Sequence, residues 1–122
     1  MYKFYNANVL GNEVDDCVIR AISLAEGNTW DYTYNKLSDL AQAQGRMIDD
    51  SIFVRSYLDS RYERIPTYNK TVGEVSGMYP NNICLITMRG HITCSMPNGT
   101  TGLIIDSFDC RERIAEYAWK IA

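Results

Sequence analysis

The most restrictive feature of this sequence is a change in the spacing of its apolar residues near residue 83. Before that point apolar residues recur three and four positions apart, which is typical of helices, as in Val18, Ala21, Ile22 and Ala25. After it, short apolar runs alternate with turn signals, which is typical of strands. Helices followed by an antiparallel meander predict an α+β fold, with N-terminal helices packed on a small antiparallel sheet. The 122 residues fit a single domain spanning 1–122.

Three helices are predicted in the first half of the chain. The first begins after Asp15-Asp16 and ends at Gly27, so that Cys17 lies in its first turn. The second runs from Trp30 to about Gly45, and the third starts near Asp49-Asp50. Their expected buried residues are Tyr34, Leu37, Leu40 and Ala41 in the second helix, and Ile52, Phe53, Ser56 and Tyr57 in the third.

Strands are predicted at 83–88, 91–96 and 102–106. Arg89-Gly90 separates the first two, and Pro97-Asn98-Gly99 predicts a tight hairpin turn before the third. Residues 2–10 are expected to form a short strand or an extended lead-in, and 111–121 a strand or short helix that closes the sheet. The segment 62–80 has a loose pattern, with a short turn or helix at 71–75.

The charge and apolar pattern exclude several classes of protein. The net charge is −3 with no cluster of Lys and Arg, which argues against non-specific binding of nucleic acid but suits a basic protein partner. The apolar runs are too short to span a bilayer, and the first residues carry no apolar signal region. A cytoplasmic protein is therefore expected. No cofactor is expected, because neither a Gly-rich phosphate loop nor an acidic metal loop is found.

Cys17, His91 and Asp106 form a candidate catalytic triad. A thiol attacks as the thiolate, which a helix N-terminus and a neighbouring imidazole both stabilise. His91 is the only histidine in the chain. If 91–96 and 102–106 pair as a hairpin, the start of one strand lies beside the end of the other, which places Asp106 where it can orient His91. Asp109 is a rival for this role, and a buried structural thiol remains the alternative for Cys17.

A zinc site is a weaker alternative. His91 and Cys94 lie three residues apart, and Cys17 and Cys110 would complete a set of three thiolates and one imidazole. Residues 91 and 94 of one strand point to opposite faces, however, so this set is not expected to assemble.

Short motifs along nearly the whole chain resemble those of the papain-like cysteine peptidases. These are Asp16-Cys17 opening a helix with Arg20-Ala21, Gly90-His91 on a strand, and Asp106 after a glycine turn. The resemblance is greatest to the bacteriocin-processing (double-glycine leader) branch and to compact phage and prophage proteins. It implies a papain-like fold in which Cys17 is the nucleophile, His91 the general base and acid, and Asp106 the orienting residue.

The sequence departs from that family at two positions. A Gln six residues before the cysteine helps to form the oxyanion hole in papain-like enzymes, whereas Gly11 stands there in this chain. Asn12 carries a similar amide and is the candidate oxyanion-hole residue. The residue after the cysteine is usually small, and it is Val18 in this chain.

Two functions follow from these residues. The first is a small cysteine hydrolase that cleaves a peptide or isopeptide bond; the resemblance implies that it is phage or prophage encoded and acts in the host cytoplasm. The second is a weakly active or inactive scaffold that binds a host protein as an inhibitor. Arg20 is expected to face solvent and to pair with Asp16 or Glu26.

Overall fold

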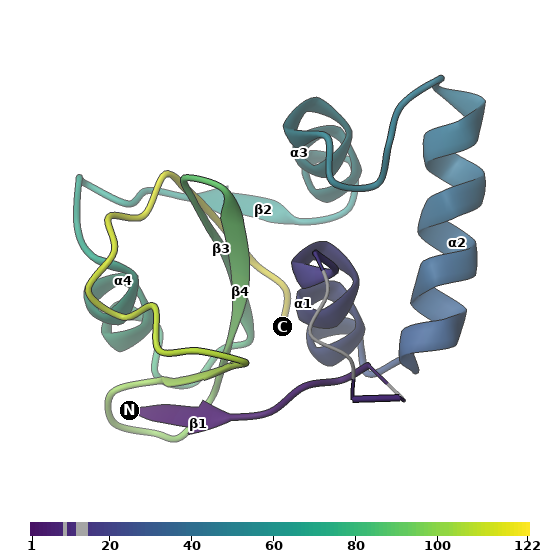
Figure 1. Ribbon diagram of the computed structural model, residues 1–122. Coiled ribbons are helices and arrows are strands. Elements are labelled where there is room, and N and C mark those ends of the chain that lie inside the picture. Colours follow the sequence, from purple (N-terminus) through teal and green to yellow (C-terminus); the bar gives the residue numbers. More distant parts are fainter. Residues whose placement is uncertain (9, 12–14) are drawn as a thin grey trace.

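Figure 1 shows the computed structural model, which describes residues 1–8, 10–11 and 15–122. Within these residues four helices flank one sheet of six strands, so the α+β prediction is confirmed. The helices are α1 (Cys17–Glu26), α2 (Trp30–Ala43), α3 (Ser51–Asp59) and α4 (Val72–Met78). The strands are β1 (Tyr2–Phe4), β2 (Glu63–Ile65), β3 (Cys84–Met88), β4 (His91–Met96), β5 (Leu103–Asp106) and β6 (Tyr117–Lys120).

The sheet has the order β1-β5-β4-β3-β6-β2. Its centre is the predicted meander, because β4 pairs antiparallel with both β3 and β5. β6 settles the ambiguous tail as a strand that pairs antiparallel with β3. The sheet is not purely antiparallel, since β1 lies parallel to β5. β2, within the loosely patterned segment, adds an edge strand. It has only three residues, which is too short for an alternating apolar pattern to predict it.

The ends of α1 are the ones that the sequence predicts, but the role of Asp16 differs. Asp16 occupies the N-cap position, but its side chain accepts no capping hydrogen bond from the first turn. Gly27 ends the helix with a φ of 71°, a left-handed conformation that glycine adopts without strain. The Asp16 carboxylate is thus free to bind other groups, as the candidate site shows.

The predicted buried faces of α2 and α3 are only partly right. Leu37 and Ala41 are buried in α2, whereas Tyr34 is exposed and stacks on Trp30. In α3, Phe53 and Tyr57 are buried as predicted, together with Val54 and Leu58, while Ile52 and Ser56 are exposed. Neighbouring apolar residues leave the rotation of a short helix undetermined by about one position, so packing decided which of them point inward.

Each face of the sheet carries its own hydrophobic core. α1, α2 and α3 cover one face, where their side chains surround Leu85, Cys94 and Trp119. α4 and the segments beside it cover the other face over Ile86 and Ile104. α1 packs directly along β4, which brings the first turn of that helix to the start of the strand. No helix among the described residues is long and apolar enough to cross a membrane.

Candidate active site

Cys17 is the first residue of α1 and is partly exposed. The other three cysteines are buried, and burial raises the pKa of Cys84 to about 11, that of Cys94 to about 12 and that of Cys110 to about 11. Val18, the bulky residue after Cys17, points into the helix-side core, which explains why a small residue is not needed there. Cys17 is therefore the one accessible thiol of the chain.

His91 and Asp106 form a direct contact. His91 begins β4 and Asp106 ends β5, and the antiparallel register of these strands brings the two residues together. The imidazole Nε2 lies 2.7 Å from Asp106 Oδ2, with both side chains more than nine-tenths buried. The prediction that His91 and Asp106 lie side by side is confirmed. Asp109, the rival, is exposed and pairs with Arg111.

Cys17 lies near the same imidazole, since both residues line one cleft. It is close enough to His91 for its thiol to influence the pKa of the ring. Burial lowers the pKa of His91, but hydrogen bonds and charge from Asp106 and Cys17 outweigh burial and raise that pKa to about 9. The imidazole can thus carry a proton at neutral pH between a thiol and a carboxylate.

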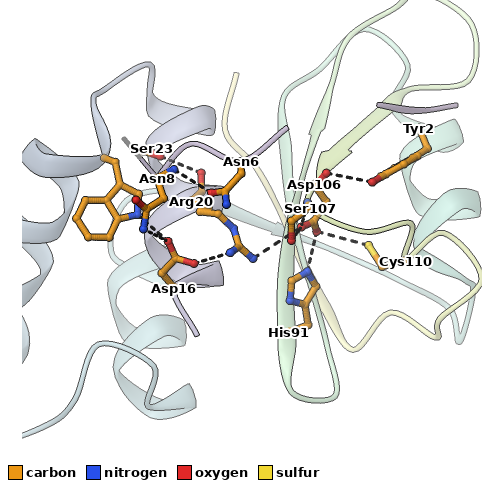
Figure 2. Close-up of polar contacts among 11 residues, drawn as sticks. Tyr2, Asn6, Asn8, Asp16, Arg20, Ser23, His91, Asp106, Ser107 and Cys110 are labelled. Atoms are coloured by element: carbon orange, nitrogen blue, oxygen red, sulfur yellow. Dashed lines mark hydrogen bonds and ion pairs between the residues drawn. The ribbon is translucent and has the colours of Figure 1, made fainter. Parts of the chain in front are cut away.

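Asp106 is the centre of a wider set of polar contacts, which Figure 2 displays. Its Oδ1 accepts the Ser107 backbone N–H at 2.7 Å, and its Oδ2 lies 3.8 Å from Cys110 Sγ. The Tyr2 hydroxyl donates to its backbone carbonyl at 3.2 Å, tying β1 to the end of β5. Burial raises the pKa of Asp106, but above all His91, and also the Ser107 backbone N–H, lower it below its ordinary value. Asp106 is therefore a carboxylate at neutral pH.

Arg20 departs from its expected place in solvent. It pairs with Asp16, as predicted, but its side chain is only 10% exposed, and its guanidinium also approaches Asp106, with Nη2 4.0 Å from Oδ1. The spacing of four between Asp16 and Arg20 was a usable signal for the pair. No pattern in the sequence predicts the contact between Arg20 and Asp106, because 86 positions separate these residues.

Phe108 covers one side of the imidazole. Its ring centroid lies 4.6 Å from that of His91, with a tilt of 43° between the planes. The Phe108 side chain stays 42% exposed, so it stands between the ring and bulk water. A hydrogen bond shielded in this way is electrostatically stronger than one in water. No pattern in the sequence predicts that Phe108 belongs to the site.

A cleft of about 990 Å³ opens at Cys17 and His91. Its walls come from the starts of α1 and α3, from the β3–β4 turn and from the segment between β5 and β6. Among the lining residues are Asp15, Asp49, Arg55, Phe108, Glu116 and Tyr117. This volume is at the upper end of the usual range for small-molecule sites. It is large enough for a few residues of an extended polypeptide.

The alternative zinc ligands, His91 and three cysteines, are not brought together in the structure. Cys94 packs in the helix-side core, away from His91, as the alternation along a strand requires. The nearest approach to a metal site among the described residues is His91, Asp106 and Cys110, whose ligand atoms lie within 4.8 Å of one another. Both His91 Nε2 and Cys110 Sγ converge on the single oxygen Oδ2 of Asp106. This geometry fits two hydrogen-bond donors better than the tetrahedral ligands of zinc.

The predicted oxyanion-hole residue, Asn12, lies outside the described residues. The backbone N–H of Cys17, at the start of α1, remains the donor that the described part of the chain provides. Comparisons with family models, with curated proteins and with solved structures find no significant match to this chain. The candidate function therefore rests on the residues themselves.

Proposed function

We propose that this protein is a papain-like cysteine hydrolase that cleaves a peptide or isopeptide bond through Cys17, His91 and Asp106. The observation that carries the proposal is the position of His91, which contacts Asp106 through Nε2 and lines the same cleft as Cys17. A buried imidazole that is bonded to a carboxylate and lies near an accessible thiol is the arrangement that nucleophilic catalysis by cysteine needs.

The reaction would proceed in two halves. His91 first takes the proton of the thiol, the Cys17 thiolate then attacks the carbonyl carbon, and the backbone N–H of Cys17 donates to the tetrahedral oxyanion, with Asn12 as the proposed second donor. The C–N bond then breaks, and His91 gives its proton to the leaving amine, which leaves a thioester on Cys17. Water attacks the thioester as His91 accepts a proton from it. The C–S bond then breaks, the acid product departs, and the thiolate of Cys17 and protonated His91 are restored.

The surroundings of the thiol favour a polypeptide substrate. The cleft is open and mixes carboxylates, arginines and aromatic rings rather than presenting a single charged pocket. Such a surface suits the backbone and varied side chains of an extended peptide better than a small metabolite. A phage-encoded enzyme that acts on a host protein, or a scaffold that only binds one, would use the same cleft.

The test is the rate at which iodoacetamide alkylates Cys17 in the native protein, followed by mass spectrometry of the modified peptide. Because the other thiols are buried with raised pKa values, Cys17 should react first. We expect His91→Ala to slow this reaction near neutral pH by about tenfold or more, since it removes the group that accepts the thiol proton. Cys17→Ala should abolish it.

A peptide library with a fluorogenic amide then tests turnover, and trapping of the thioester by hydroxylamine identifies the intermediate. A Cys17 thiol that reacts like free cysteine, and ignores His91→Ala, would reject the hydrolase. In that event, a binding partner that is retained equally by wild type and Cys17→Ala would identify the protein as a binding scaffold.

A further inference from the structure

Arg20 connects the helix that carries the thiol to the strand that carries the carboxylate. It lies one turn after Cys17 on α1, and its side chain is buried between Asp16 and Asp106. Figure 2 shows the guanidinium between these two carboxylates, with His91 beyond Asp106. A buried arginine that meets two carboxylates from separate elements needs an account beyond a surface ion pair.

Asp16 is itself held in place. Its Oδ2 accepts the Trp30 indole N–H at 2.9 Å and the Asn8 amide at 3.4 Å, while its Oδ1 accepts from Arg20. These bonds come from the start of α2 and from the segment after β1. Since the Asp16 carboxylate does not cap α1, its contacts fix the direction in which Arg20 points. The Asp16–Arg20 pair is therefore buried and held by several hydrogen bonds, unlike an exposed ion pair.

The two oxygens of Asp106 have different neighbours. Oδ2 faces His91 and Cys110, whereas Oδ1 accepts from Ser107 and faces Arg20. Opposite charges at this distance attract each other, and more strongly in a buried site than in water. This attraction biases the rotation of the Asp106 carboxylate about its last bond.

We propose that Arg20 is a positioning residue, whose guanidinium holds Asp106 with Oδ2 turned toward His91 and docks the Cys17 helix against β5. The catalytic meaning of this role rests on the proposed function. The orientation of the His91–Asp106 pair does not, and it can be measured without any substrate.

A positioning role and an effect of charge alone predict opposite shifts of the His91 pKa. Through its charge alone, a cation near the imidazolium lowers this pKa, so removing Arg20 would raise it. If Arg20 holds Asp106 Oδ2 toward His91, removing it loosens the contact that raises the His91 pKa, and that pKa should fall. The other ionisable groups around His91 are Cys17, Tyr2, Cys110, Asp15, Arg113 and Glu116.

The experiment is an NMR titration of the His91 ring protons, which are unambiguous because the chain has one histidine. Arg20→Gln is expected to lower the His91 pKa by about 0.5 or more, roughly a threefold change in the proton affinity, and Asp16→Asn, which releases Arg20, to lower it as well. Arg20→Lys, which keeps the charge but not the planar guanidinium, should also lower it. The control is Arg46→Gln, which breaks an exposed Arg–Asp pair of the same spacing, Arg46 to Asp50 at 3.1 Å, and should change nothing.

A cation acting through its charge alone would instead raise the His91 pKa in Arg20→Gln and leave it unchanged in Arg20→Lys. If Arg20→Gln does not fold, Arg20→Lys and Asp16→Asn carry the test. Folded variants that leave the His91 pKa at its wild-type value, or raise it, would overturn the proposal. Shifts of the expected signs in a protein whose Cys17 reacts like free cysteine would sustain the role of Arg20 and reject only the hydrolase.

Discussion

His91 is a buried imidazole whose pKa is raised, although burial alone would lower it. A free imidazole titrates near 6.5, and the contacts with Asp106 and Cys17 raise the pKa of His91 to about 9 despite its burial. An imidazole protonated at neutral pH can stabilise a thiolate and donate a proton to a leaving amine. The chemistry proposed for the cleft depends on this one value.

The contribution of each neighbour to the His91 pKa can be measured by NMR titration. Asp106→Asn should lower this pKa by at least about one unit, because a neutral amide no longer stabilises the imidazolium. Cys17→Ala should also lower it, since the thiol raises the pKa of the ring in the wild type. Cys84→Ala, which removes a buried thiol that makes no contact of this kind with His91, is the control. An unchanged pKa in Cys17→Ala would mean that thiol and imidazole do not interact.

The same pKa predicts how stability depends on pH. Because the folded-state pKa of His91 is raised, its contribution is fully present below about pH 6.5 and is lost as pH rises toward 9. A shift from 6.5 to about 9 corresponds to no more than about 3 kcal/mol. Denaturant unfolding of wild type and His91→Gln at pH 6 and pH 9 should show a smaller loss in the variant. Equal losses would contradict the raised pKa.

The hairpin that carries His91 and Asp106 depends on a tight approach between two elements. Gly102 precedes β5 with a φ of 70°, and a Cβ at this position would lie 2.1 Å from Ser76 Oγ and 2.5 Å from its carbonyl oxygen. Ser76 in α4 also contacts Ser95 of β4 at 2.6 Å. α4 therefore lies so close to the hairpin that only glycine fits between them.

Gly102→Ala is expected to destabilise the protein by about 3 kcal/mol or more, because left-handed strain and overpacking add together. Gly99→Ala is the matched control in the same turn. Its φ is 80°, but the nearest atom to its new Cβ would be Asn81 Oδ1 at 3.9 Å, so only the strain of about 1 kcal/mol should appear. Chemical denaturation measures both values. Similar losses in the two variants would show that the contact with Ser76 costs nothing.

At the scale of the whole molecule, Glu26 joins the helices on the face of the sheet that carries Cys17. Its carboxylate accepts hydrogen bonds from Lys36 of α2, from Tyr57 of α3 and from Tyr62 beyond it. Burial raises the pKa of Glu26, but these bonds lower it below its ordinary value. One carboxylate at the end of α1 thus ties together three segments of the helical layer.

Glu26→Gln should lower the free energy of unfolding at pH 7 by about 2 kcal/mol, because charged hydrogen bonds are replaced by weaker ones. Since the pKa of Glu26 is lowered in the folded state, its contribution is lost as pH falls, and the difference between variant and wild type should shrink below about pH 4. Glu63→Gln, which removes an exposed carboxylate 3.8 Å from Lys120, is the control. A pH-independent difference would reject the ionic account.

The sequence by itself determined the features that depend on neighbouring residues. The change of apolar period predicted the order of helices and strands, the turn residues predicted the hairpin, and its register brought His91 beside Asp106 across only 15 positions. Short-range contacts of this kind are fixed by strand alternation and turn length, which can be read locally.

Only the tertiary structure decided the contacts between distant segments. It placed β1 parallel to β5, put β2 at the edge beside β6, and buried Arg20 against Asp106. The tertiary packing also determined which apolar residues of α2 and α3 are buried. These outcomes depend on how all the elements pack at once, because burial and charge pairing are properties of the assembled core and not of a window of sequence.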